Sequence, residues 1–314
     1  MNISKLTILT SVLALGILAS CGKDGCTDPT APNYNPDATK DDGSCEEVAN
    51  EYLLTGTLSE NKTLDASHIW TLEGRVIVPS GVTLTIPAGT IIKATAGTGA
   101  NASSLVIARG GMINAEGTAS APIIMTSTSD DIAVGQTSGS SLTENVRGLW
   151  GGLLVLGNAP CSFSGDVSEL QIEGIPASET NGLYGGSDPA DNSGVLRYVS
   201  IRHGGAEIGE GNEINGLTLG GVGTGTTIEN IEVVGNVDDG IEFFGGTVNA
   251  SGLLVWGQGD DGLDIDQAYA GTISNSMVIL NEASDHALEI DGPEGSATGR
   301  SVSYTHLRAH ETQY

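Results

Sequence analysis

Short segments in which apolar and polar residues alternate recur along the C-terminal half of the chain at a nearly constant spacing. Four of them begin at Leu217, Ile241, Leu263 and Leu288, so successive segments are offset by 24, 22 and 25 residues. Alternation with a period of two residues is typical of a β-strand whose two faces meet different environments. The pattern therefore predicts short strands joined by corners, and no stretch has the spacing of a long amphipathic helix.

A second alignment, in the N-terminal half, gives a similar period. Residues 82–94 can be set above residues 103–115 with an offset of 21, which places Leu84 on Leu105 and Ile86 on Ile107. A repeat of 21–25 residues with about three short strands matches one rung of a parallel β-helix, in which equivalent strands stack at roughly 4.8 Å. We therefore expect an all-β fold, a parallel β-helix over residues 50–301. Stacked side chains are predicted inside the coil for Phe243, Ile265 and Ile290, and outside it for Glu242, Asp264 and Glu289.

The N-terminus predicts export and a lipid anchor. Residues 1–20 carry one lysine followed by a mostly apolar run, as in a secretory signal peptide. The segment Leu18-Ala19-Ser20-Cys21 resembles the lipobox of bacterial lipoproteins, which implies cleavage before Cys21 and acylation of that residue. The alternative is an ordinary signal peptide. After Cys21 no apolar run approaches the roughly 20 residues of a membrane helix, so no transmembrane span is expected in the mature chain.

Residues 21–49 predict a small acidic spacer after the anchor. Export favours a disulfide between Cys26 and Cys45, while Cys161 is expected to remain unpaired and buried. The spacer resembles the acidic Cys-bracketed repeats of bacterial surface proteins, which in turn resemble thrombospondin type 3 calcium repeats. That resemblance implies Ca²⁺ ligands in the spacer, and the alternative is a solvated linker. The implied ligands are Asp28, Asp37, Asp41 and Asp42.

The C-terminal residues 302–314 break the repeat pattern. They contain no glycine and hold two of the five histidines. Their sequence resembles the translation of a sequencing adaptor, so we expect an artefact here and a β-helix that is cut short after residue 301.

Charge narrows the classes of partner. The chain has 12 Lys and Arg against 39 Asp and Glu, a formal net charge of −27. A nucleic-acid partner is therefore not expected, because phosphate backbones are bound by clustered basic residues. Cations are the natural small partners of such a chain. No cofactor is firmly indicated, and calcium is the candidate. No phosphate-loop, dinucleotide-binding or zinc motif is present.

Three segments together resemble a family of bacterial secreted right-handed parallel β-helix lipoproteins. They span residues 76–92, 148–158 and 196–206. The resemblance implies a right-handed coil at the cell surface, anchored to the outer-membrane lipid of a Gram-negative bacterium through Cys21. Our leading hypothesis for the function is a non-enzymatic protein that binds extracellular polymers, either glycans or proteins, along the long face of the coil.

One acidic corner recurs on three predicted rungs, as Asp238-Asp239-Gly240, Asp260-Asp261-Gly262 and Asp285-His286. Three interpretations remain open. In the first, the residues form turns, because Asp accepts backbone hydrogen bonds and Gly tolerates a positive φ. In the second, stacked carboxylates bind Ca²⁺ through Asp239, Asp261 and Asp285. In the third, the corner resembles that of pectin-degrading hydrolases, which implies a polysaccharide hydrolase or lyase acting through Asp239, Asp260, Asp261 and His286.

Overall fold

The computed structural model describes residues 22–29, 31, 33–45, 51–207 and 214–296. The chain divides after residue 51 into two compact units, and each is described by itself. The predicted signal peptide, Cys21 and the predicted adaptor segment lie outside the described residues.

The smaller unit contains the predicted disulfide. Cys26 and Cys45 are bonded, with their Cα atoms 4.6 Å apart, which confirms the expected pairing. Two short strands, β1 (Asp24–Gly25) and β2 (Lys40–Asp41), pair in parallel beside it. The side chains of Asp41 and Asp42 accept the backbone N–H groups of Gly43 and Ser44, which fixes the turn before Cys45.

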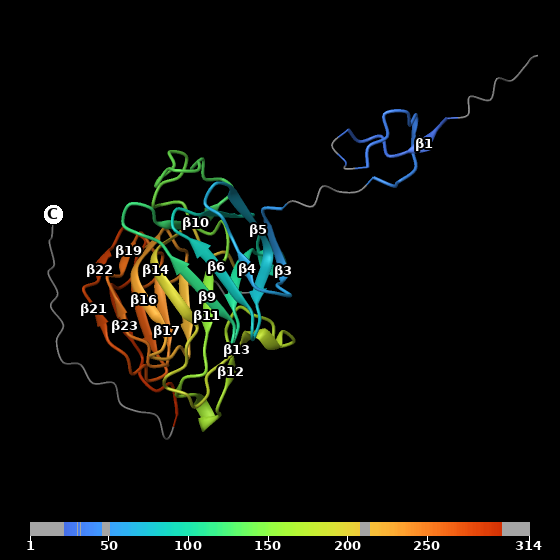
Figure 1. The fold of residues 1–314 in the computed structure, drawn as a ribbon. Helices are drawn as coiled ribbons and strands as arrows, with labels where there is room; N and C mark the ends of the chain where they lie inside the picture. The colour runs from blue at the N-terminus through green and yellow to red at the C-terminus, as the bar shows by residue number, and fades with distance from the viewer. Residues whose placement is uncertain (1–21, 30, 32, 46–50, 208–213, 297–314) are drawn as a thin grey trace, which may run out of the picture. The chain divides into compact units, whose positions relative to one another are not determined.

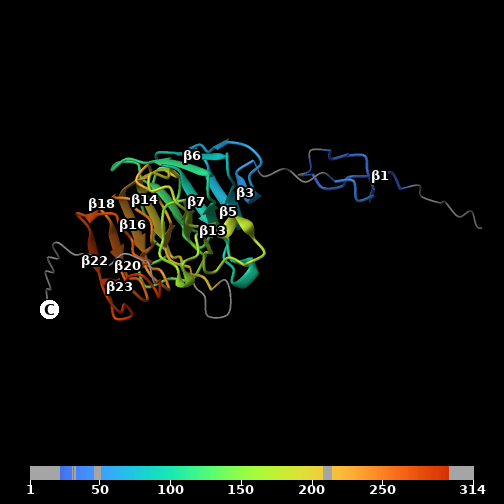
Figure 2. The same ribbon diagram turned by 90° about the horizontal axis from the view of Figure 1, so that it is seen from below.

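The larger unit is a parallel β-helix, as predicted. Nineteen of its described strands pair in parallel, and each full rung contributes one strand to each of three stacks. Figure 1 shows the rungs following one another in sequence order, from the blue and cyan strands β3 to β6 to the orange and red strands β20 to β23. The view from below in Figure 2 shows the same progression from β3 and β5 to β22 and β23.

The first stack contains the strands that carry the alternating segments beginning at Leu217, Ile241, Leu263 and Leu288. Its members are the second half of β5 (Ile69–Val78), β8 (Ser104–Ile107), β11 (Leu153–Leu156), β15 (Leu217–Gly220), β17 (Ile241–Phe244), β20 (Leu263–Asp266) and β23 (Leu288–Ile290).

The other two stacks share the long strands, which bend from one side of the coil to the next. The second stack contains β4 (Lys62–Thr63), β6 (Thr83–Pro87), β9 (Met112–Glu116), the first halves of β14 (Gly194–Arg202) and β16 (Thr227–Val234), β18 (Ala250–Ser251) and β21 (Ile273–Ser274). The third contains β3 (Leu53–Thr57), the first half of β5, β7 (Ile91–Ala94), β10 (Ile123–Ser127), the second halves of β14 and β16, β19 (Leu254–Trp256) and β22 (Met277–Ile279).

The register of the later rungs confirms the predicted offsets, whereas that of the early rungs corrects them. Leu217, Ile241, Leu263 and Leu288 stand opposite one another on successive strands. Leu84, by contrast, pairs with Ile113 and not with Leu105. The offset of 21 had compared strands on different sides of the coil. All three sides show the same alternation, so internal similarity by itself does not identify which strands stack.

The interior of the coil is one continuous apolar core. Phe243 and Ile265 stack inside it as predicted, with Ile290 packed against the same cluster. Two excursions cover parts of the outer surface. The first excursion lies between β10 and β11, and its Ile132 packs on the outward side chains of Ile91 and Ile124.

The second excursion spans residues 158–193 and covers the outer face of the first stack. Its apolar side chains form a second cluster with outward residues of that stack, including Val106, Leu154 and Phe244. It contains the antiparallel pair β12 (Leu170–Gln171) and β13 (Leu183–Tyr184). The described residues also form three short 3₁₀ helices, η1 (Gly99–Asn101), η2 (Ser164–Asp166) and η3 (Thr180–Gly182).

Candidate functional site

The acidic corner is a ladder of hydrogen bonds that connects four successive rungs. Asn215, Asp239, Asp261 and His286 occupy the equivalent position, two residues before the first-stack strand of each rung. The Asn215 Oδ1 accepts the backbone N–H of Asp239 at 3.2 Å, and Asp239 Oδ1 accepts that of Asp261 at 2.9 Å. Asp261 Oδ1 accepts the backbone N–H of His286 at 2.7 Å. Each side chain therefore binds the corner of the next rung.

Burial agrees with this structural role for the two central carboxylates. Asp239 is 7% exposed and Asp261 is 2% exposed. A buried backbone N–H without a partner is costly, so the ladder satisfies groups that the corner would otherwise leave unpaired. The interpretation as turn residues is thus supported for Asp239 and Asp261 by a specific hydrogen-bond pattern.

The glycines of the corner serve a different purpose from the one expected. Gly216, Gly240 and Gly262 do not have a positive φ, so conformational freedom does not explain them. A Cβ on each would lie 2.2–2.4 Å from a valine methyl carbon, on Val233, Val255 and Val278 respectively. Glycine is required here because the corner packs directly against a core side chain, which leaves no space for a methyl group.

The four residues of the hydrolase interpretation are brought together, but they differ in accessibility. Asp260 and His286 are exposed, whereas Asp239 and Asp261 are buried. The His286 Nδ1 lies 3.2 Å from Asp261 Oδ1 and 3.5 Å from Asp285 Oδ1. A polymer passing the corner therefore meets Asp260, Asp285 and His286, while the two buried carboxylates face the ladder.

The three corner residues of the calcium interpretation fall into two different groups. Asp261 and Asp285 gather with His286, and Asp239 gathers with Asp238 and Asp260. Within the described part of the spacer, Asp28, Asp37, Asp41 and Asp42 belong to no group of three potential ligands. Asp37 is instead paired with the ammonium of Lys23 at 2.8 Å.

A further acidic group lies on the outer face of the first stack, directly beside the corner. Glu242, Asp264 and Glu289 stand opposite one another on β17, β20 and β23, which confirms the predicted ladder. The outward position does not make all three accessible to solvent, because Glu242 is 5% exposed and Asp264 is 9% exposed. The second excursion covers this face in the earlier rungs, and its Glu173 lies near enough to influence Glu242.

The electrostatics of this face favour protons or cations. Burial is the main cause that raises the pKa of Asp239 to about 8 and that of Asp264 to about 6. Burial also raises the pKa of Glu242 well above its usual range. Two residues after Asp264, at the end of β20, burial and a hydrogen bond to Glu294 raise the pKa of Asp266 to about 9. Repulsion among the carboxylates adds to each of these shifts.

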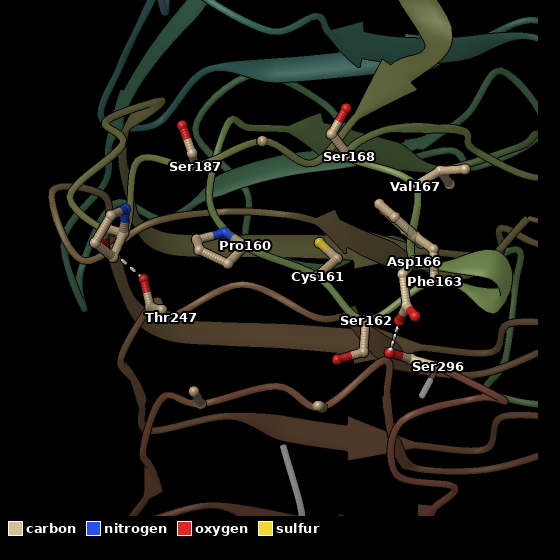
Figure 3. A pocket seen from close by; sticks show the side chains of 14 residues that line it. Pro160, Cys161, Ser162, Phe163, Asp166, Val167, Ser168, Ser187, Thr247 and Ser296 are labelled. Atoms are coloured by element: carbon tan, nitrogen blue, oxygen red, sulfur yellow. Dashed lines mark hydrogen bonds between the residues drawn. The ribbon is translucent and has the colours of Figure 1, made fainter. Parts of the chain in front are cut away.

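A hollow on the larger unit lies elsewhere, between the second excursion and the later rungs. This pocket of about 450 Å³ is lined by the hydroxyl groups of five residues, one carboxylate and several apolar side chains. Figure 3 shows Asp166 hydrogen-bonded to Ser296 on one side, with Cys161 and Pro160 toward the centre and Thr247 on the other side. The hydroxyl-bearing residues are Ser162, Ser168, Ser187, Thr247 and Ser296.

Cys161 is a pocket residue with an unreactive thiol. It forms no disulfide, as predicted, and its Sγ donates to the carbonyl of Phe244 at 3.3 Å. Burial raises the pKa of this thiol to about 12, so the nucleophilic thiolate is scarce at neutral pH. The side chain is half-buried and acts as part of the wall.

The sequence did not identify the pocket. Its lining comes from five separate segments of the chain, and serines are common in surface loops for many reasons. The one local signal was the irregular stretch between residues 158 and 194, because long excursions from a regular coil are often functional.

Comparison with known proteins identifies the domain. The family described as a pectate-lyase-like β-helix domain matches residues 56–310. Searches of curated proteins and of solved structures gave no match. No helix among the described residues is long and apolar enough to cross a membrane.

Proposed function

Because the chain belongs to the pectate-lyase-like β-helix domain family, we propose that it is a surface-anchored lipoprotein that binds extracellular polysaccharide without cleaving it. The fold is compatible with a polysaccharide ligand. The observation that carries the proposal is the pocket of about 450 Å³ with its five hydroxyl-bearing residues. Hydroxyl groups beside apolar side chains suit the alternating polar and apolar faces of sugar rings.

The corner ladder supports binding over catalysis. A general acid or base must reach the proton that it transfers. Asp239 and Asp261 are buried, and each accepts a backbone N–H of the next rung. Their carboxylates are therefore engaged in holding rungs together.

The anchor completes the proposal. Acylation of Cys21 would hold the coil at the outer membrane, with the disulfide-bonded unit between lipid and ligand-binding domain. A Cys21→Ser variant expressed in a Gram-negative host is expected to move from the detergent phase to the aqueous phase. Partitioning of this variant into detergent would contradict the lipid anchor.

Polysaccharide binding is tested by filling the pocket. Ala270 lines it and is exposed, so Ala270→Trp would occupy its volume with little effect on the core. The control is Ser138→Trp, an exposed position that does not line the pocket. On an array of bacterial and plant polysaccharides, the wild-type chain and the control are expected to bind the same glycan. Ala270→Trp should weaken this binding at least tenfold, and equal binding by all three would contradict the assignment.

A polysaccharide hydrolase or lyase is the second candidate, favoured by one contact. His286 is exposed and its Nδ1 lies 3.2 Å from Asp261 Oδ1, an arrangement that orients an imidazole for proton transfer. Release of reducing or unsaturated sugars from an acidic polysaccharide, abolished by His286→Ala, would establish this activity in place of simple binding.

A further inference from the structure

The strongest unassigned feature of the described residues is an acidic group formed by the outer face of β17 and β20 together with the corner residue before β17. It consists of Asp239, Glu242 and Asp264, which we call the strand-face triad. Each residue offers one carboxylate oxygen, and these oxygens all lie within 4.8 Å of one another. Asp239 and Glu242 belong to one rung and Asp264 to the next, so the triad spans the junction between two rungs.

An independent observation points to a ligand at the triad. The Asp264 Oδ1 is buried and has no hydrogen-bond partner among the described residues, in a side chain that is only 9% exposed. Buried carboxylate oxygens are almost always hydrogen-bonded or bound to a metal, because desolvation without compensation is costly. The unpartnered oxygen belongs to the group whose potential ligand atoms converge.

The surroundings add negative charge to the triad. The groups with the largest electrostatic effect on its three carboxyls are themselves acidic, and they come from the corner, from β20, from the turn after β23 and from the second excursion. They are Asp238, Asp261, Asp266, Asp291 and Glu173. Like charges at such distances repel strongly unless a proton or a cation lies between them.

We propose that the strand-face triad binds one Ca²⁺ ion, which joins the two rungs that carry β17 and β20. The donor set consists of carboxylate oxygens. Such oxygens suit hard cations such as Ca²⁺ and Mg²⁺ better than they suit zinc or copper. Low exposure leaves little room for the several water molecules that Mg²⁺ retains, which favours Ca²⁺. Because the site is buried, this ion stabilises the coil and is independent of polysaccharide binding.

The site differs from the calcium site expected from the sequence. Asp261 is already engaged by His286, and Asp285 is exposed on the next rung. Only Asp239 is shared between the two sets. The triad therefore combines one corner residue with two residues of the strand face, and among its oxygens Asp264 Oδ1 has no hydrogen-bond partner in the described part of the chain.

The test compares the full chain with two variants after treatment with EDTA and return to chelator-free buffer. Asp264→Asn removes the negative charge of the triad residue whose Oδ1 has no partner, and Asp285→Asn removes an exposed carboxylate of the corner group as a matched control. Melting temperature is measured with and without 5 mM CaCl₂, and bound Ca²⁺ is counted by native mass spectrometry.

We expect Ca²⁺ to raise the melting temperature of the wild-type chain and of Asp285→Asn by a few degrees, but not that of Asp264→Asn. Without Ca²⁺, Asp264→Asn should melt above the wild-type chain, because it removes repulsion within the triad. If Asp264→Asn does not fold, Glu242→Gln is measured in its place with the same expectation.

Three results would overturn the proposal. The first is no calcium-dependent shift in the wild-type chain. The second is an equal shift in all variants, which would place the ion elsewhere, for example in the spacer. The third is a shift lost in Asp285→Asn and retained in Asp264→Asn, which would place the ion at the corner.

Discussion

Replacing Asp261 by alanine or by asparagine separates the two roles that its carboxylate can have. The side chain is 2% exposed, and its Oδ1 accepts the backbone N–H of His286 at 2.7 Å. Both substitutions remove a negative charge from the acidic corner. Only alanine also removes the hydrogen-bond acceptor, whereas the amide oxygen of asparagine can replace it.

The chain itself contains a precedent for the asparagine variant. One step earlier in the ladder, Asn215 holds the position before Asp239 and accepts the N–H of Asp239 through its Oδ1. An amide therefore fits this corner geometrically. The difference between the two variants then isolates one hydrogen bond, since the loss of charge is common to both.

The expected magnitude follows from leaving one backbone donor without a partner. A buried or partly buried unsatisfied donor costs about 1–3 kcal/mol. Asp261→Ala should therefore be about 1–3 kcal/mol less stable than Asp261→Asn. The asparagine variant should be as stable as the wild-type chain or slightly more so, because Asp261 raises the pKa values of Asp239 and Asp264 through repulsion.

Urea denaturation followed by far-UV circular dichroism, in EDTA, measures these free energies of unfolding. Asp260→Ala is the control, because this exposed neighbour is expected to change stability by less than about 0.5 kcal/mol. Equal destabilisation by alanine and asparagine would refute the ladder as the role of Asp261. An Asp261→Ala variant with the same free energy of unfolding as the Asp260→Ala control would also refute it.

Three further predictions concern packing, reactivity and pH. Gly240→Ala places a Cβ 2.2 Å from a methyl carbon of Val255, so overpacking should lower the free energy of unfolding by about 1–3 kcal/mol, as measured by urea denaturation. Cys161, with its pKa raised to about 12 by burial, should react slowly with a disulfide reagent in the native chain and rapidly in 8 M urea; fast native labelling would contradict its place in the wall. In EDTA, the pKa of Asp239 near 8 lies above its unfolded value near 4, so the folded chain binds the extra proton and stability should fall as pH rises from about 4 to about 8. Urea midpoints at pH 5 and pH 8 measure this loss, and a higher midpoint at pH 8 would contradict it.

The sequence determined the type of strand and the stacking of the later rungs. The alternating segments that begin at Leu217, Ile241, Leu263 and Leu288 can be aligned without a structure. Their two-residue period and their nearly constant spacing allow only one alignment of successive strands. In the N-terminal half the offsets are uneven, and Leu84 stands opposite Ile113 at an offset of 29 residues. There the same alternation on every side of the coil made two alignments look alike.

Tertiary structure decided what the acidic residues do. In the sequence, Asp239 and Asp261 each lie between an aspartate and a glycine, and Asp264 lies between two apolar residues, but neither context specifies which atoms the carboxylate meets. In the coil, the first two accept backbone N–H groups of the next rung, while an oxygen of the third remains without a partner. The direction of each side chain and its distance from the next rung set these roles. Burial decided the protonation of the outward side chains, because Glu242 and Asp264 are enclosed although they lie outside the coil. No local sequence pattern specifies which distant segment will cover an outer face. Alternation specifies which side of a strand a residue occupies, whereas its solvation depends on segments far away in the chain.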